Sequence, residues 1–85
     1  MAFTIEFTAS AEREFKALER STQRRIVTAI DVLAENPFHP GVKKLQGEHG
    51  LYRTRAGDYR VIFRVDGKRV RVLILKIGHR REVYR

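Results

Sequence analysis

The stretch LYRTRAGDYRVIFRVDGKRVRVLILKI, residues 51–77, decides the fold, because β-forming residues fill three segments that turn residues separate. We expect three strands in it, at 51–56, 59–65 and 69–77. The first two are joined through Ala56–Asp58, and the Asp66–Gly67 pair is typical of a tight hairpin between the second and third. Such short connections predict antiparallel neighbours. The run Val72–Leu75 is apolar at every position, which indicates a strand covered on both faces and therefore central in the sheet.

The first forty residues predict one strand followed by two helices. Alternation of apolar and polar residues over 3–8 indicates a half-buried strand. Ser10 is the expected N-cap of a first amphipathic helix and Ser21 that of a second, which Asn36 and Pro37 end. The helical hairpin is therefore expected at 10–35, with a loop over the core from 37 to 50.

These elements predict an α+β fold: an N-terminal strand, a helical hairpin and a three-stranded antiparallel meander, forming a four-stranded sheet with the helices on one face. At 85 residues we expect a single domain, residues 1–85, with the other sheet face open for function. The chain contains no cysteine and no run approaching the ~20 apolar residues of a membrane span. We therefore expect a cytoplasmic protein without disulfides, a signal peptide or a membrane segment.

Positive charge is concentrated in the second half of the chain. Residues 1–40 carry five Lys/Arg and six Asp/Glu, whereas residues 41–85 carry thirteen and four. Segregation of this kind indicates a surface that binds a polyanion. Because side chains alternate along a strand, Arg53, Arg55 and Arg60 are expected to converge on the open face, while Tyr59, Val61 and Phe63 point towards the helices.

Three motifs resemble one toxin family. They are Leu51-Tyr52-Arg53, Gly57-Asp58-Tyr59-Arg60-Val61 and Gly78-His79-Arg80-Arg81-Glu82-Val83-Tyr84, and Lys44-Leu45 followed by Gly47 fits the same order. Over nearly its whole length the chain resembles the RelE branch of the RelE/ParE toxins. The resemblance implies a type II toxin that enters the ribosomal A site and cuts messenger RNA, silenced by an acidic, RelB-like antitoxin in a hetero-oligomer.

The resemblance also implies roles for individual residues. Arg60 and Arg80 match the family's phosphate-binding arginines, and Tyr84 matches a tyrosine used in stacking or proton transfer. Arg53 and Arg55 occupy two strand positions where the best-known members have lysines, so the chain departs from the family there. Further contacts to RNA phosphates are expected from Arg81, Lys43 and Lys44.

RNA cleavage without a metal requires a base for the 2′-hydroxyl, cations for the phosphorane and an acid for the departing 5′ oxygen. Arginine suits the second task and not the first, because deprotonating it near pH 7 costs roughly 7 kcal/mol. The base is left open between His79, Tyr84 and a group of the ribosome or RNA, and Tyr84 is the expected acid. No metal or cofactor is expected, since His39 and His49 have no second ligand at metal spacing.

Two other functions are compatible with the sequence. A ParE-like DNA gyrase inhibitor shares the fold but does not need Arg60, Arg80 and Tyr84 together. A non-catalytic RNA-binding module binds with strong salt dependence and releases no product. The chain has no helix-turn-helix pattern, so we expect DNA contact only through the antitoxin.

Overall fold

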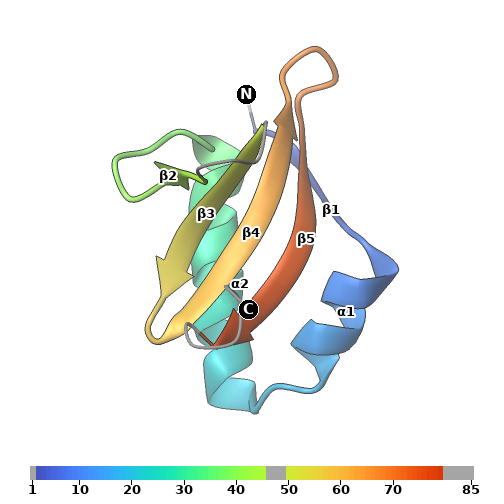
Figure 1. Ribbon diagram of the computed structural model, residues 1–85, viewed down its shortest axis with the longest axis vertical. Coiled ribbons are helices and arrows are strands. Elements are labelled where there is room, and N and C mark those ends of the chain that lie inside the picture. The colour runs from blue at the N-terminus through green and yellow to red at the C-terminus, as the bar shows by residue number, and fades with distance from the viewer. Residues whose placement is uncertain (1, 46–49, 80–85) are drawn as a thin grey trace.

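The computed structural model describes residues 2–45 and 50–79, which form two helices and five strands (Figure 1). In chain order they are β1 (Thr4–Phe7), α1 (Ala9–Lys16), α2 (Arg20–Glu35), β2 (Lys43–Lys44), β3 (Leu51–Ala56), β4 (Tyr59–Asp66) and β5 (Arg71–His79). None of the helices in these ranges is long and apolar enough to cross a membrane.

The sheet order is β1-β5-β4-β3-β2, with β3, β4 and β5 antiparallel and β1 parallel to β5. The predicted α+β class and the antiparallel meander are confirmed. The strand count was wrong by one, because Lys43 and Lys44, expected in a loop, pair with Arg53 and Tyr52 as the short edge strand β2. A two-residue strand has too little periodicity to be found by pattern alone.

A single apolar core lies between the helices and the sheet. Ala11 of α1 and Ile26 and Leu33 of α2 are fully buried together with Val61 and Phe63 of β4. Figure 1 shows α2 passing behind β3 and β4, and α1 beside β5. This arrangement leaves the other face of the sheet without helices.

Strand β5 is central in the sheet, as predicted, and its neighbours are β1 and β4. It contains a bulge that its sequence did not reveal. Ile62 pairs with Lys76 and Phe63 with Ile74, so Leu75 has no partner on β4. A bulge reverses the alternation of the residues beyond it. Buried side chains on β5 therefore run Val72, Ile74 and then Ile77, and Lys76 is turned out of the core.

The first helix begins earlier than predicted. Oγ1 of Thr8 accepts the backbone N–H of Ala11 at 3.1 Å, so Thr8 is the N-cap in place of Ser10. The same hydroxyl lies 3.3 Å from the carbonyl of Leu75 and donates to it, which ties the helix start to the bulge. Thr8 was assigned to the strand because it continues the alternation of residues 3–8. The second helix begins at Arg20, one residue before Ser21, and its N-cap Glu19 makes no capping hydrogen bond.

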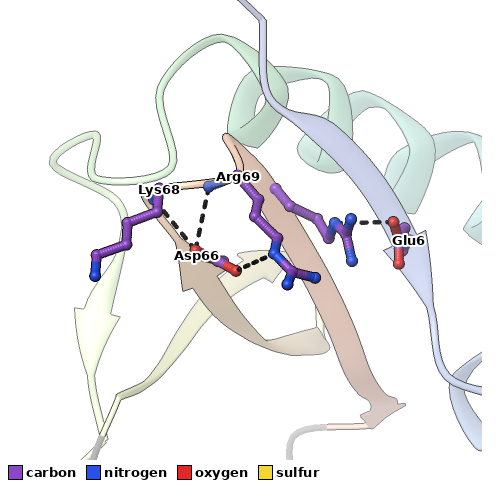
Figure 2. A network of polar contacts seen from close by, with 5 residues as sticks. Glu6, Asp66, Lys68 and Arg69 are labelled. Atoms are coloured by element: carbon purple, nitrogen blue, oxygen red, sulfur yellow. Dashed lines mark hydrogen bonds and ion pairs between the residues drawn. The ribbon is translucent and has the colours of Figure 1, made fainter.

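The β4–β5 connection is longer than the expected two-residue turn. Asp66 pairs with Arg71, so Gly67–Val70 form the loop. Oδ1 of Asp66 accepts the backbone N–H groups of Lys68 at 3.1 Å and Arg69 at 3.2 Å, as Figure 2 shows. This side-chain turn replaces the hairpin geometry that Asp66–Gly67 predicted. Val70 then adopts φ +52°, an uncommon conformation for a β-branched residue.

The β3–β4 connection is the tight one. Ala56 pairs with Tyr59, which leaves Gly57 and Asp58 as the two-residue loop. Gly57 has φ +64°, and glycine at the first central position of a hairpin is typical of a type II′ turn. This turn lies at the end of the sheet opposite the β4–β5 loop (Figure 1).

Candidate nucleic-acid interface

Arg53, Arg55 and Arg60 lie on the helix-free face of the sheet, and Arg64, two positions beyond Ile62 on β4, shares that face. Arg55 pairs directly with Arg60, and Arg53 pairs with Ile62. Cross-strand partners project from the same face, about 5 Å apart at Cβ. Their neighbours Thr54 and Val61, which pair with each other, are buried on the helix side. The structure thus brings Arg53, Arg55 and Arg60 together as their alternation predicted.

The two lysines of β2 lie on opposite faces of the sheet. Lys43 pairs with Arg53 and so extends the arginine face by one cation, whereas Lys44 pairs with Tyr52 on the other side of the alternation. Both side chains are exposed. Only Lys43 therefore stands in register with the arginines that were expected to hold RNA phosphates.

Arg60 occupies the position on this face where β4 meets the end of β5. Its partner on β5 is Gly78, so β5 places no side chain beside it. Arg60 is half-buried and lines a small pocket of about 40 Å³ with Arg55, Gly57 and Tyr59. That volume is of the order of one water molecule, enough for a phosphate oxygen and too small for a nucleotide.

His79 lies on the opposite face from Arg60. It pairs with Tyr59, whose ring packs against the core, and the two rings meet edge to face with centroids 5.6 Å apart. The structure thus separates His79 from the arginine face. Arg80, Arg81 and Tyr84 lie outside the described residues.

Arg25 joins this end of the molecule from α2, and sequence reasoning missed it. A Cβ built on Gly57 would lie 3.2 Å from Nη1 of Arg25, so the guanidinium lies against the turn that borders the Arg60 pocket. Residues 25 and 57 are far apart in sequence, and helical periodicity alone gives no reason to couple them. The one sequence feature that pointed to a functional arginine on this helix was the Arg24–Arg25 pair, two adjacent cations in an amphipathic segment.

Two arginines at the β4–β5 end of the sheet form ion pairs. At the β4–β5 end, Arg71 Nε lies 3.0 Å from Oε2 of Glu6 and Arg69 Nε lies 3.9 Å from Oδ2 of Asp66 (Figure 2). At the other end, neither Arg53, Arg55 nor Arg25 forms an ion pair within residues 2–45 and 50–79. Uncompensated guanidiniums of this kind attract a polyanion. The same ranges contain no group of three His, Cys, Asp or Glu side chains placed to hold a metal ion.

Comparison with known proteins shows the family of this chain. The family model described as the ParE toxin of the type II toxin–antitoxin system, parDE, matches residues 5–84. Toxin RelG of Mycobacterium tuberculosis is 30% identical over 86 residues, covering 100% of this chain and 99% of RelG. The chain belongs to the RelE/ParE superfamily of type II toxins.

Solved structures place the chain in the same group. The RelBE2 toxin–antitoxin complex of M. tuberculosis contains a chain that superposes with a TM-score of 0.84 at 30% identity, covering 93% of this chain and 99% of that one. The archaeal RelE–RelB complex of Pyrococcus horikoshii gives 0.81 at 31% identity, with coverages of 98% and 100%. The predicted RelE-like fold and family are therefore confirmed.

Proposed function

We propose that this toxin is a metal-independent endoribonuclease that cuts messenger RNA in the ribosomal A site. The observation that carries the proposal is the convergence of Arg53, Arg55 and Arg60 on the open sheet face beside the end of β5. The relatives at or above 30% identity bear RelE and RelG names, which supports the nuclease branch.

In the proposed reaction the 2′-hydroxyl loses its proton and attacks the adjacent phosphorus. The bond from phosphorus to the 5′ oxygen breaks, leaving a 2′,3′-cyclic phosphate, and the departing 5′ oxygen gains a proton to become a 5′-hydroxyl. Arg60 and Arg80 bind the non-bridging oxygens and stabilise their growing charge, since arginine forks match phosphate and remain charged. Tyr84 supplies the proton to the leaving oxygen.

The placement of His79 bears on the choice of general base. Its ring contacts Tyr59 on the opposite face from Arg60, so direct proton transfer from a nucleotide held by Arg60 requires a rearrangement. Because Tyr84 is assigned as the acid, we favour a group of the ribosome or RNA as the base. A His79→Gln variant is expected to cut at a rate close to wild type, and a loss of a hundredfold or so would return the role to His79.

Purified protein added to programmed ribosomes tests the proposal. The wild type is expected to cut messenger RNA within the A-site codon, and Arg60→Gln to lower kcat by about 10²–10³-fold, the usual effect of removing one transition-state donor. Arg69→Gln, with the same change of charge at the far end of the sheet, is the control and should retain full activity. If messenger RNA stays intact on ribosomes treated with the wild-type protein, the nuclease proposal is refuted.

A DNA gyrase poison is the second candidate, because the matching family model is described as a ParE toxin. A gyrase poison leaves RNA whole and traps cleaved DNA in a gyrase reaction. The two assays, run on the same preparation, separate the candidates. A non-catalytic RNA-binding module would yield product in neither.

We also propose an acidic RelB-like antitoxin as the partner of this chain, forming a hetero-oligomer in the cytoplasm. The structural neighbours from M. tuberculosis and P. horikoshii are toxin–antitoxin complexes, and the net charge of +8 complements acidic segments. DNA contact would come through that partner. Harmless overproduction of the toxin alone, without an antitoxin, would count against this assignment.

A further inference from the structure

A groove on the helix side of the molecule begins where the arginine face ends. It lies between α2 and the β3–β4 turn, with a volume of about 410 Å³. Its basic lining residues are Arg24, Arg25 and Arg55, and its apolar floor includes Val32 and Ala56. Ligand pockets usually have volumes of 300–1,000 Å³, so the groove has room for a nucleotide where the Arg60 pocket does not.

The groove and the Arg60 pocket are adjoining sites. Arg55 and Gly57 line both of them. The guanidinium of Arg25 lies against Gly57, in the space that a side chain at that position would occupy. An extended polyanion that passes from the Arg60 pocket around the β3–β4 turn therefore meets Arg25 next.

The charge of the groove is of one sign. None of its lining residues is acidic, and in the described part of the chain no carboxylate forms an ion pair with Arg24, Arg25 or Arg55. Three guanidiniums around one groove repel each other unless an anion lies between them. Phosphate matches the planar fork of arginine in geometry as well as in charge.

We propose that this groove binds the phosphodiester backbone of RNA beside the Arg60 pocket, with Arg25 and Arg24 as RNA-binding residues. The proposal rests on the proposed nuclease function and extends it to a second subsite. Continuity with the Arg60 pocket favours RNA over an acidic peptide. The backbone comes either from the messenger flanking the codon or from ribosomal RNA, because both present the same phosphates.

The first test is an Arg25→Gln variant assayed on programmed ribosomes. Glutamine preserves helix propensity and the exposed position needs no buried partner, so folding is expected to be unchanged. KM should rise about tenfold with kcat unchanged, because a phosphate contact away from the reacting atoms contributes to substrate and transition state equally. Arg13→Gln, an exposed arginine on α1, is the matched control and should leave both constants unchanged.

A second measurement does not depend on cleavage. Binding of a single-stranded RNA with a 2′-deoxy residue at the cut site is followed by fluorescence anisotropy against salt concentration. Arg25→Gln should reduce the slope of log K against log salt by about 0.7, the value for one phosphate contact on a single strand. Shortening the messenger after the codon identifies the source: loss of the Arg25 effect assigns the phosphate to messenger, and its persistence assigns it to ribosomal RNA.

Three results would overturn the subsite. An unchanged KM and salt slope would remove Arg25 from RNA binding. A fall in kcat alone would place it in the chemical step. Weaker antitoxin binding with an unchanged KM for RNA would assign the groove to the antitoxin. If the wild type cuts no RNA but Arg25→Gln still lowers the salt slope, the nuclease proposal fails and the RNA-binding groove stands.

Discussion

Replacing Glu14 with alanine is expected to destabilise the end of β5 that leads into the site. Strand β1 pairs only with residues 71–74 of β5, so the edge beyond has no strand beside it. Glu14 of α1 takes that place: its Oε1 accepts the backbone N–H of Ile77 at 3.0 Å, and its Oε2 lies 3.8 Å from Nζ of Lys76. One carboxylate thus binds both a backbone N–H and a lysine side chain next to the bulge.

The magnitude follows from these two contacts. A hydrogen bond to a charged group contributes about 1.5–3 kcal/mol, and a half-exposed ion pair adds only a few tenths. Alanine recovers about 0.4 kcal/mol through its higher helix propensity. We expect Glu14→Ala to lower the free energy of unfolding by about 2 kcal/mol and Glu14→Gln, which keeps an acceptor oxygen, by about half as much.

Urea unfolding followed by circular dichroism measures this difference. With an m-value of about 1 kcal/mol per molar for a chain of this size, the midpoint should fall by about 2 M for alanine. The control is Glu12→Ala in the same helix, where the carboxylate is exposed and forms an ion pair with Lys16, 2.9 Å away. Lys16 holds the pKa of Glu12 below its usual value, so the small contribution of that pair is present near neutral pH and lost as pH falls through the folded-state pKa. Equal midpoints for Glu14→Ala and Glu12→Ala would refute the role of Glu14.

Two further changes test the local structure. Thr8→Ala removes the N-cap acceptor for Ala11 and the hydroxyl donor to Leu75, and should lower the free energy of unfolding by about 1–2 kcal/mol in the same urea assay. The control Ser10→Ala should cost much less. If Ser10→Ala cost more than Thr8→Ala, the cap assignment would be wrong. Val70→Asn places a residue that tolerates positive φ where the backbone has φ +52°. It is expected to raise the free energy of unfolding by about 0.5–1 kcal/mol, and a loss of that size would show that the valine side chain outweighs its backbone strain.

Much of the fold was available from periodicity. The meander was located to within two residues at every strand end, because alternation and turn residues are local signals. Asn36 and Pro37 correctly marked the end of the second helix. The shared face of Arg53, Arg55 and Arg60 followed from the same period of two.

The errors arose where one segment depends on another. Strand β2 exists because Lys43 and Lys44 find partners on β3, and Thr8 caps α1 while also binding Leu75. The bulge at Leu75 turns Ile77 inward and Lys76 outward, which no pattern within 69–77 indicates. The β4–β5 loop is set by the side chain of Asp66, which accepts two backbone N–H groups.

By itself the sequence determined the order of every element except β2, the segregation of charge and the residues that alternate on the open sheet face, because each depends on neighbours within a few positions. Only the tertiary structure decided that Arg25 lies against the turn at Gly57 and that His79 faces Tyr59 instead of Arg60. Those placements depend on helix packing and strand register, and both are set by contacts between residues that are far apart in the chain.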